Sequence, residues 1–275
     1  MGKLIQGDDG LPAEEVGVWV KEKHDVLCKY VQISSATRKK YLPPKNRGGA
    51  AYIDLFCGTG RGQIEGTKEW IDGGAVAAWK RSVECNTPFT RVIVGDANRD
   101  RLEACEERLR RLDAPVVATC GLAKDTAFWA RQRTPPHGLN FAFLDPFSLE
   151  ALDYEAIKSL AQIKRIDMLV HVSTMDLQRN LKLNLTAEDS AFDSFAPGWR
   201  DVLEIRSKAR TREDLLTYWR ELVSKTGIWT SEDVRLIKGS RGQRLYWLLL
   251  AAGHDLAHRF WKSVAPKDGQ ASLNL

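Results

Sequence analysis

The most informative segment of the chain is Tyr52-Ile-Asp-Leu-Phe-Cys-Gly-Thr-Gly-Arg-Gly62. The apolar run from Ala50 to Phe56 predicts a short buried β-strand. A turn with three glycines follows it, at Gly58, Gly60 and Gly62. Because glycine has no side chain, such a turn can pass close to a bound nucleotide-like ligand. The segment therefore predicts a strand that ends in a ligand-binding loop.

The spacing within this loop favours one kind of ligand. A dinucleotide-binding loop has the pattern G-x-G-x-x-G, and here the third glycine comes one position early. Asp54 precedes the first glycine by four residues. An acid at that distance favours the methionine amino and carboxyl groups of S-adenosylmethionine over a pyrophosphate. The alternative is a tight turn between a strand and a helix that binds no ligand.

The residues that follow alternate between strand-like and helix-like patterns. Further strands are predicted at residues 90–95, 116–120, 139–144 and 167–172. Helices are predicted between them, at residues 75–83, 99–112, 126–131 and 154–163. Such alternation is typical of a parallel sheet that is covered by helices on both faces and doubly wound.

The last hundred residues change character. Residues 175–226 are polar and helical in pattern, and they predict an insertion. Strands at residues 234–237 and 245–250 then flank Lys-Gly-Ser-Arg-Gly-Gln, which suits a hairpin turn, and a helix over residues 254–264 follows. Five parallel strands followed by a hairpin match the seven-stranded sheet of S-adenosylmethionine-dependent methyltransferases, whose final strand runs antiparallel.

The predicted fold is therefore α/β: a doubly wound, seven-stranded, methyltransferase-like (Rossmann-like) sheet with a helical insertion before the final β-hairpin. Residues 1–48 are predicted to form an N-terminal helical segment and linker, and residues 49–174 the cofactor-binding α/β core. Residues 175–230 are predicted to form the helical insertion, and residues 231–275 the hairpin and helix that complete the core.

Composition excludes several classes of protein. The chain has 275 residues, of which 43% are hydrophobic and 28% charged, as in ordinary globular proteins. Its longest apolar run, Leu245 to Ala252, is far shorter than the ~18 residues that a membrane-spanning helix needs. The first ten residues lack the apolar stretch of a signal peptide. Five cysteines without a CxxC pair argue against a disulfide framework or a zinc site, and we expect a cytoplasmic protein.

The net charge of +5 is mildly basic and comes from clusters. They are Arg38-Lys39-Lys40 with Lys45 and Arg47, then Arg108 to Arg111, then Arg206 to Arg212, and finally Lys238, Arg241 and Arg244. Such clusters can follow a phosphate backbone, so RNA or DNA is a candidate partner. The alternative is that they are solvated helix faces matched by nearby acids.

Three acids at the carboxyl ends of strands are candidates for cofactor contacts, together with Phe56, Gly58 and Gly60. Asp54 and the glycines would hold the methionine end. Asp96 follows the second strand, where an acid can accept both ribose hydroxyls, although it can also be a solvated turn acid. Asp125 follows the third strand and could approach the adenine amino group. His254 and His258 have no third ligand nearby, so no metal site is predicted.

Candidate catalytic residues follow the fourth strand, in Asn140-Phe-Ala-Phe-Leu-Asp-Pro-Phe-Ser148. Asp145 can accept a hydrogen bond from an amino group, and Phe147 can stack a flipped base. Asp145, Pro146 and Phe147 resemble the Asp-Pro-Pro-Tyr signature of methyltransferases that act on exocyclic amino groups. The alternative is a turn in which Asp-Pro caps the next segment.

Nearly the whole chain resembles the three-Cys-motif partner protein family. The resemblance lies in Glu22-Lys-His-Asp-Val-Leu-Cys-Lys-Tyr30, Tyr52-Ile-Asp-Leu-Phe-Cys-Gly-Thr-Gly60, Phe143-Leu-Asp-Pro-Phe147 and Leu245-Tyr-Trp-Leu-Leu-Leu-Ala-Ala-Gly-His-Asp-Leu-Ala-His-Arg-Phe-Trp261. Cys57 stands where the family usually has alanine, and Ser148 where glycine is common. The resemblance implies a class I methyltransferase fold, a bacterial or phage protein and an iron–sulfur partner with three clustered cysteines.

These features predict an S-adenosylmethionine-dependent methyltransferase that modifies an amino group of a nucleic-acid base. The alternative is a non-catalytic methyltransferase-fold subunit of a three-cysteine iron–sulfur protein. The intact loop with Asp54 favours the enzyme, whereas the incomplete Asp-Pro-Phe motif favours the subunit. A nicotinamide-dependent oxidoreductase is a third hypothesis, and the glycine spacing argues against it.

Overall fold

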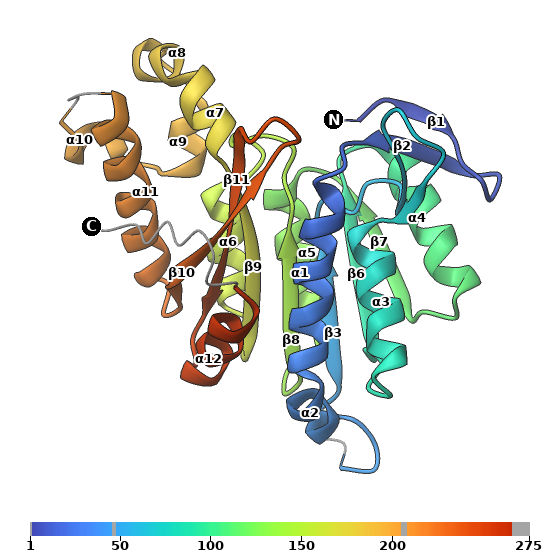
Figure 1. The fold of residues 1–275 in the computed structure, drawn as a ribbon. Helices are drawn as coiled ribbons and strands as arrows, with labels where there is room; N and C mark the ends of the chain where they lie inside the picture. The colour runs from blue at the N-terminus through green and yellow to red at the C-terminus, as the bar shows by residue number, and fades with distance from the viewer. Residues whose placement is uncertain (1, 46–47, 205–207, 266–275) are drawn as a thin grey trace.

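The computed structural model describes residues 2–45, 48–204 and 208–265. A seven-stranded sheet forms its centre, in the order β10-β11-β9-β8-β3-β6-β7 (Figure 1). The strands are β3 (Ala50–Asp54), β6 (Arg91–Asp96), β7 (Val116–Cys120), β8 (Leu139–Leu144), β9 (Ile166–Ser173), β10 (Trp229–Lys238) and β11 (Arg244–Ala252). The first five are parallel, and β11 runs antiparallel to both β9 and β10. This order confirms the predicted methyltransferase-like sheet.

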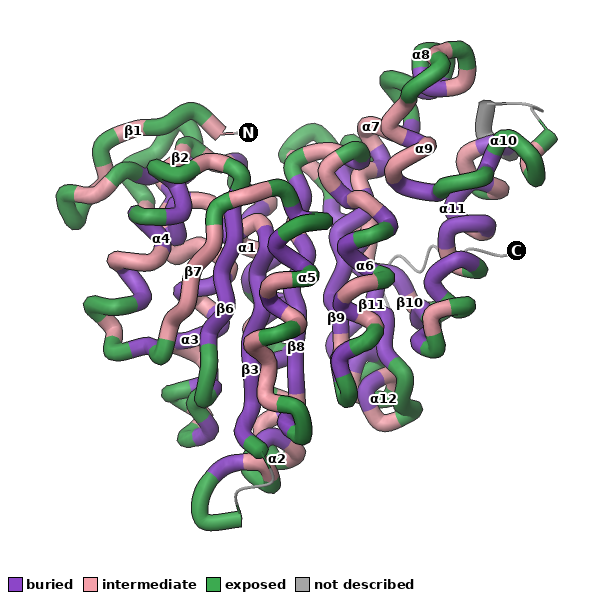
Figure 2. The backbone as a smooth tube through the Cα atoms, turned by 180° about the vertical axis from the view of Figure 1, so that it is seen from behind, coloured by how far each residue is buried: buried purple, intermediate pink, exposed green. Residues whose placement is uncertain are grey.

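Helices cover both faces of this sheet (Figures 1 and 2). Those on one face are α1 (Val20–Ile33), α3 (Gly74–Glu84), α4 (Arg99–Arg111) and α12 (Asp255–Val264). The opposite face carries α5 (Ala123–Arg133) and α6 (Tyr154–Ala161). Strand β3 is buried at every residue, which explains why it reads as an unbroken apolar run rather than an alternating one.

Helices lie between β9 and β10, where the insertion was predicted. They are α7 (Thr174–Arg179), α8 (Leu181–Thr186), α9 (Ala191–Phe195), α10 (Trp199–Val202) and α11 (Lys208–Ser224). α7 and α8 extend beyond the end of the sheet, and α11 lies beside the edge strand β10 (Figure 1). Phe195 stacks on Trp219 with ring centroids 5.1 Å apart, and both are fully buried. The insertion therefore packs through its own aromatic side chains, which join the core beneath α5 and α6.

A second, smaller sheet was not predicted. It consists of β1 (Leu4–Gln6), β2 (Pro12–Val16), β4 (Arg61–Ile64) and β5 (Trp70–Asp72), in that order. Only a helical segment and a linker were predicted for residues 1–48, so β1 and β2 are additions to the predicted fold. β1 and β2 are only three and five residues long, and β2 also pairs in parallel with the distant β4, so no local pattern in the sequence predicts them.

The small sheet also changes the role of Gly62. This glycine lies in β4, and a side chain on it would come within 2.8 Å of Val16. The helix that follows the glycine loop starts only at Gly74, after the hairpin of β4 and β5. Gly62 therefore packs two strands together and does not belong to the turn itself.

The remaining short elements are α2 (Ser35–Arg38) and a 3-10 helix, η1 (Lys39–Tyr41).

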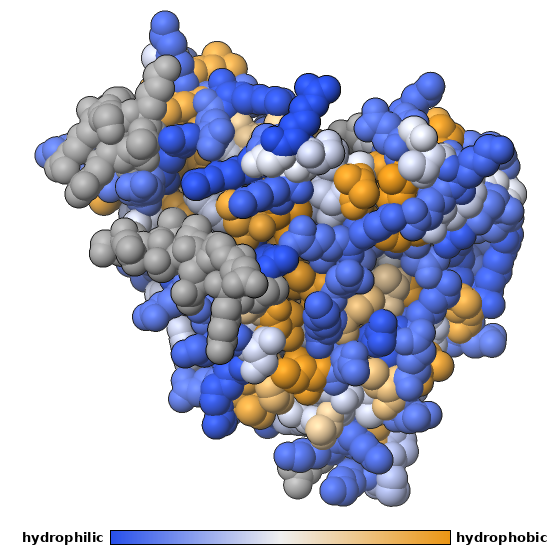
Figure 3. Space-filling view, in the orientation of Figure 1, coloured by the Kyte–Doolittle hydropathy of each residue, from blue (hydrophilic) through white to orange (hydrophobic). Residues whose placement is uncertain are grey.

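In the face seen in Figure 3, apolar side chains gather over the middle and hydrophilic ones surround them. Within the described residues, no helix is long and apolar enough to cross a membrane.

Arg38 opens the first predicted basic cluster, yet only 1% of it is exposed. Its Nε donates to the Thr87 carbonyl oxygen at 2.7 Å, and its Nη1 donates to the Val31 carbonyl oxygen at 3.0 Å. Burial lowers the pKa of this guanidinium to about 10. Arg38 thus ties α1 to the loop after α3, and its predicted contact with nucleic acid is wrong.

Replacing Arg38 with alanine should lower the free energy of unfolding by about 2–4 kcal/mol, because two buried carbonyl groups lose their donors. Urea unfolding measures the change. Lys40→Ala is the control, since Lys40 is exposed in the same cluster, and it should stay within about 0.5 kcal/mol of the wild type. Equal effects of the two variants would contradict a structural role for Arg38.

Candidate functional site

Two adjoining cavities open at the carboxyl ends of the parallel strands. The larger has a volume of about 660 Å³ and the smaller about 100 Å³. They share several lining residues: Glu14, Val16, Val20, Lys23, Phe56, Gly58 and Asp145. Ligands of doubly wound sheets bind at this edge, so the two cavities form one candidate site.

The glycine loop after β3 forms part of the floor of the site. Gly58 and Gly60 have φ angles of 55° and 77°, which favour glycine. A side chain on Gly73, just before α3, would come within 2.7 Å of the backbone of Gly60. The start of α3 is therefore packed directly against the loop, as close backbone approach requires.

Carboxylates already occupy two N–H groups of the loop. Asp96, at the end of β6, accepts from the Gly58 N–H at 3.0 Å and from the Asn98 N–H at 2.8 Å. Glu14, from β2, accepts from the Thr59 N–H at 3.2 Å. The Gly58 and Thr59 N–H groups are therefore not free to bind a phosphate group. The side of the loop where a phosphate would bind carries carboxylate oxygens instead.

Asp54 lies at the end of β3 and is 2% exposed. It accepts hydrogen bonds from the Phe56 N–H at 3.0 Å and from the Tyr52 hydroxyl at 3.3 Å. Burial raises the pKa of this carboxyl to about 7, and the nearby Asp145 adds to the increase. A cation bound in the smaller cavity would favour the ionised form.

Asp145 follows β8, and both of its oxygens have partners. Oδ2 accepts from the Lys23 ammonium, and Oδ1 lies 2.8 Å from Nδ1 of His171. Because a carboxylate can only accept, Nδ1 of His171 carries the proton. Burial alone would raise the pKa of Asp145, but Lys23 and His171 outweigh it and hold this pKa below its ordinary value. Burial lowers the pKa of His171, which favours a neutral imidazole.

Sequence reasoning missed Lys23, His171 and Tyr246, which all line the larger cavity. The ring centroids of His171 and Tyr246 are 3.9 Å apart. Three buried polar atoms around Asp145 and the smaller cavity have no partner: Nδ1 of His24, Nε2 of His171 and the hydroxyl of Tyr246. Unpartnered buried atoms are costly, and their gathering here indicates a site built for a polar ligand. In the sequence, Lys23 lies among other charged residues, whereas His171 and Tyr246 are polar residues within apolar runs, which was the one signal available.

The other predicted residues lie as follows. Phe56, Pro146 and Phe147 line the larger cavity, and Phe147 is 57% exposed. Asp125 is exposed on the first turn of α5 and does not line the larger cavity. The preceding loop lines the cavity instead, through Gly121 and Leu122.

The basic clusters do not form a free surface as a whole. Arg108 is 5% exposed, and Arg110 and Arg111 pair with acids one turn earlier on α4. Arg206 and the side chains of Lys208 and Arg210 lie outside the described residues. For Arg108 the predicted phosphate contact is wrong, because its guanidinium is used inside the protein.

No protein-family model matches the chain, and no curated protein matches it either. Solved structures resemble it at low identity. An O-methyltransferase from Bacillus cereus in complex with SAH is 13% identical, with a TM-score of 0.47, over 89% of this chain and 85% of that one. TomG, an O-methyltransferase from Streptomyces achromogenes in complex with SAM, is 12% identical, with a TM-score of 0.42, over 82% and 88%.

TYW2 from M. jannaschii in complex with AdoMet is 9% identical, with a TM-score of 0.45, over 91% of this chain and 84% of that one. At such values the likeness assigns no ligand or reaction to this chain. The resemblance to three-Cys-motif partner proteins stays a prediction.

Replacing Asp54 with asparagine should stabilise the ligand-free protein at alkaline pH. The pKa of Asp54 is about 7 in the folded protein and ~3.9 in an unfolded chain, so the folded protein favours the protonated carboxyl. The contribution of Asp54 to the free energy of unfolding is therefore complete below pH ~4 and is lost as the pH rises through about 7. At pH 8 the variant should be more stable by about 2–4 kcal/mol, and the gain should shrink towards pH 5.

Thermal unfolding at several pH values measures this difference. Asp25→Asn is the control, because Asp25 is exposed on α1. A gain that does not depend on pH would contradict a raised pKa at Asp54.

Proposed function

We propose that the chain is an S-adenosylmethionine-dependent methyltransferase. The observation that carries this proposal is the occupation of the Gly58 and Thr59 N–H groups by the carboxylates of Asp96 and Glu14. A pyrophosphate needs free N–H donors at such a loop, whereas a cationic ligand needs carboxylates. The site therefore suits a cofactor that carries an ammonium and a sulfonium group.

The cavities can accommodate the parts of this cofactor. Asp54, Gly58 and Gly60 line the smaller cavity and would hold the methionine end. Asp96 keeps lone pairs free for the ribose hydroxyls, since each carboxylate oxygen can accept more than once. Gly121 and Leu122 would lie against the adenine, in place of the predicted Asp125. When bound, the cofactor supplies an electrophilic methyl group.

The target would be an amino group of a nucleic-acid base, in RNA or DNA. Phe147 supports this proposal, because an exposed aromatic ring at a cavity mouth can stack a flat base. Asp145 would accept a hydrogen bond from the amino group through lone pairs not used by Lys23 and His171. His171 would hold the carboxylate in position.

The alternative is a non-catalytic subunit of a three-cysteine iron–sulfur protein. The paired Asp145 and the unpartnered atoms beside it favour the enzyme, because a polar substrate in the cavity would supply the partners that these atoms lack. The transfer assay described below separates the two hypotheses.

Binding of S-adenosylmethionine should depend on Asp96. Asp96→Ala should weaken binding about 10-fold or more in calorimetry, since hydrogen bonds to a charged group contribute ~1.5–3 kcal/mol each. Asp96→Asn, which keeps an acceptor, should lose less. Asp100→Ala, an exposed change on α4, is the control. If the wild type shows no heat with S-adenosylmethionine, or no preference for it over NAD, the cofactor proposal fails.

Removal of Asp145 should impair methyl transfer far more than cofactor binding. Asp145→Ala should lower the rate of transfer from labelled S-adenosylmethionine to total cellular RNA or DNA by roughly 100- to 1000-fold. Asp145→Asn should lose less, because an amide oxygen still accepts. Glu155→Gln, exposed on α6, is the control. A wild type that binds cofactor but labels nothing, with or without an iron–sulfur partner, would favour the scaffold.

A further inference from the structure

The N-terminal hairpin of β1 and β2 forms a wall of both cavities. Glu14 and Val16 of β2 line each of them, and Gly2 and Glu15 line the larger one. Strand β2 pairs with β4 directly after the glycine loop, with Glu14 opposite Gly62. The first residues of the chain thus lie beside a loop that begins more than forty residues later.

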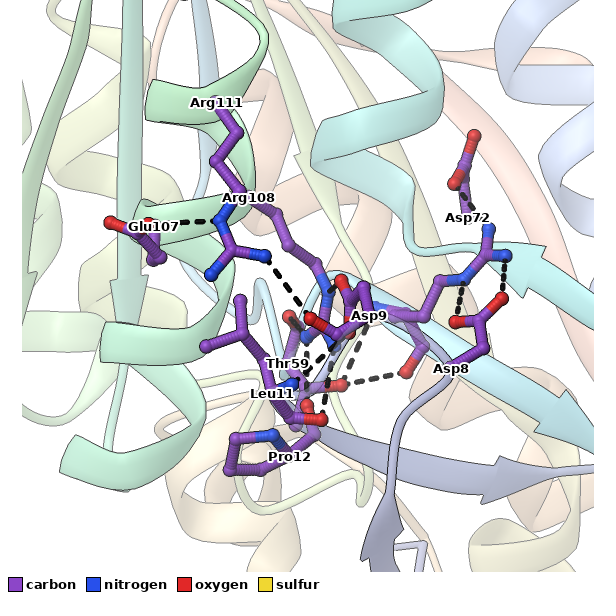
Figure 4. Close-up of polar contacts among 10 residues, drawn as sticks. Asp8, Asp9, Leu11, Pro12, Thr59, Asp72, Glu107, Arg108 and Arg111 are labelled. Atoms are coloured by element: carbon purple, nitrogen blue, oxygen red, sulfur yellow. Dashed lines mark hydrogen bonds and ion pairs between the residues drawn. The ribbon is translucent and has the colours of Figure 1, made fainter.

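Arg108 fixes the hairpin to the glycine loop (Figure 4). Its Nε and Nη2 each donate to the carboxylate of Asp9 at 2.7 Å, as a bidentate pair. Its Nη1 donates to two carbonyl oxygens, of Pro12 and Thr59, both at 2.7 Å. Since Thr59 belongs to the loop, one buried guanidinium sets the position of the hairpin relative to the loop.

Glu14 is the side chain that this arrangement brings to the loop. A side chain on Gly58 would come within 2.5 Å of its Oε2, so the carboxylate lies directly against that glycine. Its Oε1 is 3.5 Å from Nη2 of Arg101. Each oxygen retains a lone pair for a further donor.

The charges around the smaller cavity favour a cation. Among its lining carboxylates, Asp72 pairs with Arg61 and Lys80, and Asp145 pairs with Lys23. Asp54 has no ion pair within the described part of the chain. Nδ1 of His24, which also lines this cavity, is buried and has no partner. An ammonium group, with three donors and one positive charge, matches these acceptors.

We infer that Glu14 binds the α-ammonium group of S-adenosylmethionine together with Asp54, and that Arg108 and Asp9 position Glu14 for this contact. The inference rests on the proposed function. It makes the N-terminal hairpin part of the cofactor site, and Glu14 a residue that selects the cofactor.

Calorimetry with two ligands tests the contact. The ligands are S-adenosylhomocysteine and its analogue without the α-amino group. In the wild type, loss of the amino group should weaken binding about 10-fold or more, and in Glu14→Gln by no more than about 3-fold. Glu65→Gln, exposed at the end of β4, should keep the wild-type ratio.

The outcomes are distinct. If the wild type binds S-adenosylhomocysteine and the ratio is the same in Glu14→Gln, the role of Glu14 is overturned and the proposed function stands. If the wild type binds neither ligand, the proposed function itself fails.

A second variant tests the positioning role, because Arg108→Ala would leave buried carbonyl groups without donors and could fail to fold. Asp9→Ala keeps Arg108 and removes the bidentate pair, together with the bond that Asp9 accepts from the Leu11 N–H at 3.2 Å. Asp9→Ala should reduce the ratio of the affinities for S-adenosylhomocysteine and its analogue as Glu14→Gln does. The double variant, with both changes, should reduce this ratio no further. Arg110→Ala, exposed on the same helix, is the control. A lower melting temperature with an unchanged ratio would show that Asp9 is merely structural and would overturn its positioning role.

Discussion

The Gly58 and Thr59 N–H groups of the glycine loop find their acceptors inside the protein, on carboxylates that other strands bring to the loop. In a common strand–loop–helix unit, the helix begins at the loop and its free N–H groups face the ligand. Here the hairpin of β4 and β5 intervenes, and α3 begins only at Gly74. Carboxylates of Asp96 and Glu14 satisfy Gly58 and Thr59 instead. A loop that would otherwise attract anions is thereby lined with negative charge.

The same constraint explains the N-terminal hairpin and its buried arginine. Glu14 can reach the loop only if β2 pairs with β4, and that pairing brings carbonyl groups of the hairpin and the loop together. A buried guanidinium is costly unless its donors are satisfied, and the bonds of Arg108 to Asp9, Pro12 and Thr59 meet that condition. Removal of Asp9, Pro12 or Thr59 as an acceptor would leave a buried donor of Arg108 without a partner. The hairpin, the glycine loop and α4 therefore form one unit.

The large sheet could be predicted from the sequence because burial on both faces leaves a local pattern of apolar runs between helices. Asp54, Asp96 and Asp145 could be chosen because topology places the ends of parallel strands together. The small sheet could not be predicted, since its strands are only three to five residues long and the pairing of β2 with β4 that joins its two hairpins is non-local. The burial of Arg38 and Arg108 could not be predicted from the sequence either, because a basic residue is expected at the surface unless its buried partners are known.

Buried Asp54 and partly buried Asp145, at the ends of neighbouring strands, show how the site separates its charges. Burial raises the pKa of both, yet Asp54 remains near 7 whereas Asp145 falls below its ordinary range. The difference comes from Lys23 and His171, which pair with Asp145 and not with Asp54. Pairs of acids whose pKa values are driven apart are typical of functional sites. A cation bound beside Asp54 would do for that carboxylate what Lys23 does for Asp145: it would favour the ionised form and lower the pKa.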